Sequence, residues 1–196
     1  MKATKTKIFG LILAGGYSRR MGRDKGLLDF NGRPQIEYVD GLLRKHCSRV
    51  FLSKRKEQKP YKRIAWINDA KEFSGIGPLG GILSAMKEYP DMAWFIAACD
   101  LPFITDDTIQ TLFSNRDPQK TATAFMSTQD DLPEPLCAIW EGHAYNATIK
   151  MFQEGVHCPR RILINSDTHL IKQTNAHWLD NINTSQEYDR IVDLSL

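Results

Sequence analysis

The feature that most constrains the fold is an uninterrupted apolar run at residues 8–14 (IFGLILA), which stops at Gly15 and Gly16. A run of this kind, bounded by a turn signal, fits a β-strand that is buried on both faces, as in parallel sheets. It is much too short to cross a bilayer, which needs roughly 20 apolar residues. The run therefore predicts an α/β fold with a mostly parallel central sheet between layers of helices.

Strand and helix signals alternate through the first 115 residues and continue less regularly after them. This alternation is typical of a parallel sheet with helices on both faces. Further strands are predicted at residues 50–52, 64–67, 94–98, 121–126 and 135–140. Helices are predicted from Pro34, from Ile82, after an N-cap at Thr105 and over residues 144–152, whereas residues 72–81, with four glycines, are predicted to be a loop. Residues 160–164 fit either a helix or a strand.

Charge is distributed unevenly along the chain, although the net charge is only +3. Residues 1–63 carry 17 Lys and Arg against 5 Asp and Glu, a net charge of +12, and the remainder has a net charge of −9. A basic first third is typical of chains that bind nucleic acid, or several phosphates in one site. Residues 54–62 are expected to be mostly a solvated surface.

The cysteines and the N-terminus indicate the compartment. The four cysteines include no C-x-x-C pair, which is not the pattern of a disulfide scaffold. The first residues lack the long apolar segment and the cleavage site of a signal peptide. We therefore expect a cytoplasmic protein with no membrane partner.

The segment that carries the chemistry, residues 13–25, reads LAGGYSRRMGRDK. Glycines directly after a buried strand let backbone N–H groups approach a ligand without interference from a Cβ atom. Phosphate oxygens bind backbone donors and cations together, and the cations that follow the glycines here are Arg19, Arg20, Arg23 and Lys25. The spacing matches neither G-x-x-x-x-G-K-[ST] nor G-x-G-x-x-G, which disfavours a P-loop NTPase and a dinucleotide dehydrogenase. The segment predicts a nucleoside triphosphate at the carboxyl end of the first strand.

The pattern L-A-G-G-x-S-x-R-M-G-x-D-K resembles the signature of the molybdenum cofactor guanylyltransferases, which are nucleotidyltransferases with a Rossmann-like, three-layer α/β/α fold. Three later segments resemble the same family in the same order. They are its second glycine-rich loop at residues 77–81, its strand-end aspartate segment at 99–103, and its C-terminal N-x-N-T-P-E element at 181–187, with Ser185 in place of proline. The resemblance implies one nucleotidyltransferase domain over residues 1–196. Its nucleotide-binding part would be at about 1–115 and its acceptor-binding part at about 116–196.

The resemblance also implies a reaction. The phosphate of molybdopterin, or of molybdenum-molybdopterin, would attack the α-phosphate of GTP and release pyrophosphate, giving the guanine dinucleotide form of the cofactor. Mg²⁺ is the implied cofactor. The implied partners are GTP, the pterin acceptor, and proteins that deliver molybdopterin or mature molybdoenzymes, with no nucleic acid and no membrane.

Catalytic roles fall on three residues that match the family motifs. Lys25 would bind phosphate oxygens through the transition state, and Arg19 would do the same or hold the leaving pyrophosphate. Asp100 would hold Mg²⁺, a hard ion that prefers carboxylate oxygens and water. Further contacts to the nucleotide would come from the backbone of Leu13, Ala14, Gly15 and Gly16.

Other assignments concern the base, the metal and the acceptor. Asp69 matches an aspartate that contacts the nucleotide, and Asn183, with Asn181 as the alternative, matches a second metal ligand beside Asp100. Where the family often has Asn at the end of its second strand, this chain has Ser53. Residues 133–140 resemble a strand on the acceptor side, and we hypothesise that the pair at residues 160 and 161, both Arg, meets the phosphate or dithiolene side of the pterin.

Three alternatives stay open. The same fold could use CTP or another phosphorylated acceptor, although Gly15 and the glycine-rich loop at 77–81 favour guanine by resemblance, because cytidine-using relatives tend to have Ala-Ala-Gly at the strand end. The chain could instead be a nucleotide-sensing domain without catalysis. The chain could also be a basic nucleic-acid binder, whose affinity for DNA or RNA would depend steeply on the salt concentration.

Overall fold

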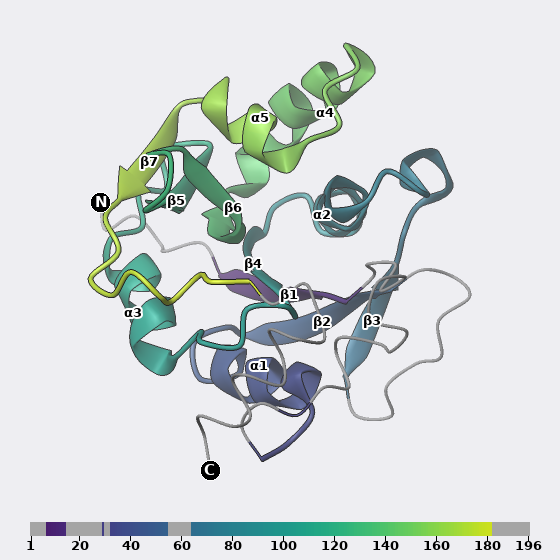
Figure 1. Cartoon of the computed structure of the whole chain (residues 1–196). Coiled ribbons are helices and arrows are strands. Elements are labelled where there is room, and N and C mark those ends of the chain that lie inside the picture. Colours follow the sequence, from purple (N-terminus) through teal and green to yellow (C-terminus); the bar gives the residue numbers. More distant parts are fainter. Residues whose placement is uncertain (1–6, 15–28, 30–31, 55–63, 182–196) are drawn as a thin grey trace, which may run out of the picture.

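The computed structural model describes residues 7–14, 29, 32–54 and 64–181. Within these residues the chain forms one sheet of seven strands in the order β3-β2-β1-β4-β6-β5-β7 (Figure 1). The strands are β1 (Ile8–Leu13), β2 (Arg49–Lys54), β3 (Ala65–Asn68), β4 (Ala93–Ala98), β5 (Ala122–Met126), β6 (Pro133–Trp140) and β7 (Thr168–Ile171). The helices are α1 (Gln35–Leu43), α2 (Pro78–Glu88), α3 (Asp106–Ser114), α4 (Tyr145–Gln153) and α5 (Pro159–Ile164), with short 3₁₀ turns at Lys71–Phe73 and Gly142–Ala144.

The helices cover both faces of the sheet. Figure 1 shows α1 and α3 on one side, with α2, α4 and α5 on the other. Successive side chains of a strand point to opposite faces. On β1, Ile8 and Ile12 accordingly pack in the cluster with α1, while Phe9 and Leu11 pack in the cluster with α2. Every residue of β1 is buried, which confirms the strand and the three-layer α/β fold that the sequence predicts.

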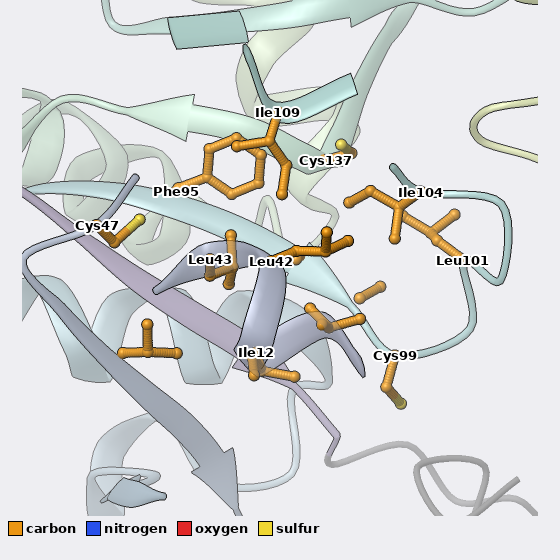
Figure 2. Close-up of a cluster of buried hydrophobic side chains, with 14 of the residues drawn as sticks. Ile12, Leu42, Leu43, Cys47, Phe95, Cys99, Leu101, Ile104, Ile109 and Cys137 are labelled. Carbon is orange, nitrogen blue, oxygen red and sulfur yellow. The ribbon is translucent and has the colours of Figure 1, made fainter. Parts of the chain in front are cut away.

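The cluster between the sheet and helices α1 and α3 is apolar and closely packed. Figure 2 shows part of it, where Phe95 of β4, Leu43 of α1 and Ile109 of α3 meet. Burial raises the pKa of the Cys47 thiol in this cluster to about 12, so the thiol stays protonated. Cys137, predicted to be a core residue, is 1% exposed.

Two features differ from the sequence-based expectation. The helix predicted from Ile82 begins at Pro78, because Gly77 adopts a φ of +74° and proline fits the first helical turn. β7 was not predicted, and its four half-buried residues form an edge strand parallel to β5. β6 runs antiparallel to both β4 and β5, which agrees with the mostly parallel sheet that the sequence predicts. The ambiguous segment at residues 160–164 is helical.

A buried ion pair ties the end of β6 to the segment after α3. Arg116 Nε and Nη2 donate to the two carboxylate oxygens of Glu141, each at 2.7 Å. The two side chains are only 8% and 3% exposed.

Within the described residues, no helix combines the length and the apolar character that a bilayer span requires.

Candidate active site

The site follows from the order of the strands. Strands β2 and β3 lie on one side of β1, and the chain then passes through α2 to β4 on the other side of β1. Such a reversal leaves a crevice at the carboxyl ends of the two central strands, where α/β proteins bind their ligands. Here those ends are Leu13 of β1 and Ala98 of β4, which are paired in register.

Ala14, the last described residue before the predicted phosphate loop, and the predicted metal ligand Asp100 follow neighbouring strands. The N–H of Cys99 donates to the carbonyl oxygen of Leu13 at 3.2 Å, so Ala14 and Asp100 follow from adjacent positions. Ala14 is buried and Asp100 is half-buried. Gly15, Gly16, Arg19 and Lys25 lie outside the described residues, as does Asn183.

The donors that the structure describes suit Mg²⁺ bound with a nucleotide. No group of three or more His, Cys, Asp or Glu side chains in the described part of the chain could hold a metal by itself. Mg²⁺ in phosphate-transfer sites usually takes one or two carboxylates and completes its shell with water and substrate phosphates. Asp100, half-buried at the end of a central strand, supplies a carboxylate of that kind.

On the side of β2 and β3, the crevice is lined by small residues that bring α2 close to the sheet. A Cβ atom on Gly81 would lie 2.3 Å from Ser53 Oγ and 3.0 Å from Leu13 Cδ2, so only glycine allows this contact. The hydroxyl of Ser84 donates to the Gly80 carbonyl at 2.6 Å and accepts the N–H of Ala70 at 2.8 Å. The glycine-rich segment predicted to meet the purine thus packs directly against the ends of β1 and β2.

Ser53 and Asp69 lie together at this part of the crevice. Ser53 Oγ is 3.4 Å from Asp69 Oδ1, a long hydrogen bond, and Asp69 donates its backbone N–H to the carbonyl of Lys54. The carboxylate that the sequence assigns to the nucleotide therefore adjoins the serine that stands in place of asparagine. Lys54, expected to be a solvated residue, is only 7% exposed, and its ammonium lies 5.7 Å from the ring centre of Trp66. That expectation was wrong because the edge strand β3 covers its side chain.

On the opposite side, a cavity of about 200 Å³ opens between the end of β4 and the start of β6. Asp100 and Leu101, which follow β4, and Arg160 of α5 form part of its lining. The remaining residues are four from β6 (Glu134, Pro135, Leu136 and Cys137) and two near the end of the described chain (Leu179 and Asn181). β6 is antiparallel to β4, so its first residues lie at the same edge as the end of β4. The cavity therefore adjoins the strand-end crevice through Asp100.

The two adjacent arginines hypothesised to bind the acceptor have different surroundings. Arg160 lines the cavity and pairs with Asp130 Oδ2 at 2.7 Å and with Glu134 Oε1 at 2.6 Å. Arg161 is exposed and is not among the described residues that line the cavity. Glu134 was noted in the sequence only as part of a strand, although the PEP segment around it signals a fixed backbone. Burial, reinforced by the charge of Glu134, raises the pKa of the Cys137 thiol, so this wall of the cavity stays neutral.

The seven-stranded, mostly parallel sheet between two layers of helices defines a Rossmann-like α/β fold with a switch point beside β1. A molybdopterin-guanine dinucleotide biosynthesis protein A from Archaeoglobus fulgidus superposes with a TM-score of 0.75 over 95% of this chain and 98% of its own, at 22% identity, which shows the fold. Residues 10–171 match the family described as MobA-like NTP transferase domain, and the chain belongs to that family. The predicted family and enzyme class, a nucleotidyltransferase, are therefore confirmed.

Two curated relatives extend the comparison. A "molybdenum cofactor biosynthesis bifunctional protein" from Synechocystis is 37% identical over 191 residues, which cover 96% of this chain but 54% of that protein. A "probable molybdenum cofactor guanylyltransferase" from Bacillus cereus is 28% identical over 194 residues, which cover 93% of this chain and 94% of that protein. The chain thus spans about half of the first relative and nearly all of the second.

Proposed function

We propose that this chain transfers GMP from GTP to the phosphate of molybdopterin or molybdenum-molybdopterin and releases pyrophosphate. The observation that carries the proposal is the switch point, which sets Asp100 beside the segment that follows Leu13. A triphosphate at this crevice would have a phosphate-binding loop on one strand and a metal-binding carboxylate on the next. The activity for which the Bacillus cereus relative is named agrees with that chemistry, and that relative matches this chain along almost its whole length.

The two sides of the crevice suit the two substrates. We assign the nucleotide to the side of β2, β3 and α2, where Asp69, Ser53 and Gly81 lie together. We assign the acceptor to the cavity between β4 and β6, which residues of the second half mainly line. This supports the division predicted from the sequence, with a nucleotide part at about 1–115 and an acceptor part at about 116–196.

The reaction is a displacement at phosphorus. An oxygen of the acceptor phosphate forms a bond to the α-phosphorus of GTP, while the bond from that phosphorus to the β-phosphate bridging oxygen breaks. The protein contributes alignment and charge neutralisation. We assign the neutralisation to Lys25 and Arg19, and contacts to the phosphates to the backbone of residues 13–16.

Members of this enzyme class generally use a divalent metal, and we propose Mg²⁺ for this chain. Asp100 would hold it, with Asn183 as the second protein ligand. The bound ion would neutralise charge on the phosphate oxygens as the leaving group departs. We further propose that the protein works in the cytoplasm, where enzymes that supply molybdopterin and mature molybdoenzymes would be its partners.

The deciding experiment supplies each nucleoside triphosphate with Mg²⁺ and molybdopterin and measures pyrophosphate. We expect release with GTP that requires the acceptor, together with a guanine dinucleotide product. Release with CTP alone would contradict the guanine assignment. Nucleotide binding without pyrophosphate release would favour a nucleotide-sensing domain.

A further inference from the structure

The cavity beside Asp100 has a chemistry that differs from a phosphate site. Its volume, about 200 Å³, lies below the roughly 300–1,000 Å³ of pockets that hold drug-sized ligands. It therefore suits one flat ring system better than a whole cofactor. Apolar side chains form most of its wall, and Figure 2 shows two of them, Leu101 and Cys137, at the edge of the core cluster. Such a wall favours the faces of a heterocycle.

The charged part of the lining is acidic. Arg160 is held between Asp130 and Glu134, so this group of three has one positive and two negative charges. Asp100, the other carboxylate in the described lining, is assigned to Mg²⁺ and is not counted with this group. An anionic group would meet a guanidinium whose charge two carboxylates already offset. The cavity therefore favours a ligand edge that donates hydrogen bonds.

The carboxylate of Glu134 is held in place before any ligand arrives. Pro133 and Pro135 flank it and restrict the backbone at the start of β6. The indole N–H of Trp140 donates to the Pro135 carbonyl at 3.2 Å, and Arg160 holds Glu134 Oε1. A carboxylate fixed in this way binds a pair of adjacent N–H donors without a large loss of conformational freedom.

We propose that Glu134 accepts hydrogen bonds from the 2-amino group and the neighbouring ring N–H of the acceptor's pterin, with Arg160 as the residue that positions Glu134. The inference rests on the proposed function and names the ring system of the acceptor that the cavity recognises. Guanine carries the same donor edge. The cavity, however, lies on the β4–β6 side of β1, across from Ser53, Asp69 and Gly81, where the nucleotide is assigned. The pterin is therefore the occupant that leaves room for both substrates.

The test compares two fluorescent probes that differ only at this edge: 6-hydroxymethylpterin and 6-hydroxymethyllumazine, which has an oxo group in place of the 2-amino group. The unaltered protein should bind the pterin at least tenfold more tightly. Glu134→Gln should weaken pterin binding by about 10- to 100-fold, as expected for hydrogen bonds to a charged group, and should leave lumazine binding nearly unchanged. Glu134→Asp, which keeps the charge, should recover part of the preference.

Asp130→Asn is the matched control. It removes the other carboxylate that pairs with Arg160, at 2.7 Å, but Asp130 does not line the cavity. The preference for pterin over lumazine should survive in this variant. Equal loss in Asp130→Asn and Glu134→Gln would contradict a direct contact, and so would a preserved preference in Glu134→Gln. Failure of the unaltered protein to bind either probe at millimolar concentration would also overturn the inference.

A second part of the test measures competition by the nucleotide. GTP with Mg²⁺ should not displace the pterin probe, and Glu134→Gln should leave the KM for GTP unchanged while it raises the KM for molybdopterin. Competition by GTP, with a raised KM for GTP in the variant, would assign the cavity to guanine and overturn the inference. Pyrophosphate release by the unaltered protein, measured separately, tests the proposed function itself, so the two failures are distinguishable.

Discussion

The two sides of the strand-end crevice are built from different kinds of residue. On the side of β2, β3 and α2, small side chains allow the helix to approach the strands, as at Gly81 against Ser53. On the side of β4 and β6, a mostly apolar cavity carries a few ionised side chains, as at Arg160 with Glu134. Under the proposed assignments, the first side would recognise the nucleotide through backbone proximity and shape, and the second would recognise the acceptor through a few fixed charges. Substitutions should therefore act on them in different ways.

The largest expected effect is at the boundary between the two sides. Asp100→Asn removes the carboxylate that we assign to Mg²⁺ and keeps the shape of the side chain. Loss of metal-assisted charge neutralisation is worth several kcal/mol, so kcat should fall by about 1,000-fold, or about 4 kcal/mol. Steady-state pyrophosphate release at saturating GTP measures it.

Asp91→Asn is the control for this change. Asp91 is an exposed residue in the turn that leads into β4, at the opposite end of the same strand. The identical substitution there should leave kcat within twofold of the unaltered enzyme. A loss of less than tenfold in Asp100→Asn would remove Asp100 from the metal site.

The next effect tests whether charges also stabilise the fold on the β6 side. Arg116→Ala leaves the carboxylate of Glu141 buried without the guanidinium that now binds both of its oxygens. An uncompensated buried charge should lower the free energy of unfolding by about 3 kcal/mol. Urea denaturation measures the change.

Lys120→Ala provides the comparison, because Lys120 pairs with Asp167 in a bridge whose side chains are 35% and 71% exposed. An exposed pair should contribute no more than about 1 kcal/mol. Similar losses in Arg116→Ala and Lys120→Ala would mean that burial of the Arg116 pair has no energetic consequence.

On the other side of the crevice, shape should decide the outcome. Gly81→Ala places a Cβ atom 2.3 Å from Ser53 Oγ, an overpacking that should cost about 2 kcal/mol of stability and weaken GTP binding. The double variant Gly81→Ala with Ser53→Gly removes the nearest opposing atoms, leaves Leu13 Cδ2 at 3.0 Å, and should recover part of the stability. Thermal unfolding of the four proteins gives the coupling between the two positions.

The same substitution elsewhere should have the opposite sign. At Gly41, in α1, the nearest atom to an added Cβ would be Arg33 Nη1 at 3.5 Å, an ordinary contact. Gly41→Ala should therefore stabilise the protein by about 1 kcal/mol, because alanine favours the helix. Destabilisation of equal size at both positions would show that the tight contact at Gly81 is not what matters.

The contrast between the two sides also explains what the sequence could predict. Backbone-based recognition leaves local signals, so the buried run ending at Leu13, the glycine-rich segment at 77–81 and the strand-end Asp100 were found from residue type and order. The cavity depends on contacts between distant segments: Arg160 meets Glu134, 26 residues earlier, and both adjoin Asp100. No local pattern separates Arg160 from Arg161, whose surroundings differ. Likewise, Lys54 has the sequence context of a solvated residue, but it ends a strand that pairs with β3 and is buried.

The smallest effect concerns a surface contact between α3 and the residues that follow α1. Asp106, in the first turn of α3, accepts a hydrogen bond from His46 at 3.0 Å and lies 3.3 Å from Lys45, both just after α1. The hydrogen bond from His46, followed by Lys45, lowers the pKa of Asp106 below its ordinary value of 3.8. A carboxylate with a lowered folded-state pKa stabilises the fold above about pH 4, and this contribution disappears as the pH falls through the lowered pKa.

Asp106→Asn should accordingly reduce the Tm slightly at pH 6, and the difference from the unaltered protein should shrink as the pH is lowered below 4. Asp107→Asn, in the same turn of α3, is the control, because among the described residues the ion pairs with the end of α1 are made by Asp106. Scanning calorimetry at several pH values measures both variants. A Tm difference that stays constant from pH 6 to pH 3 would mean that the ionised form of Asp106 does not join the two helices. The contact between α1 and α3 would then depend on the apolar core that they share.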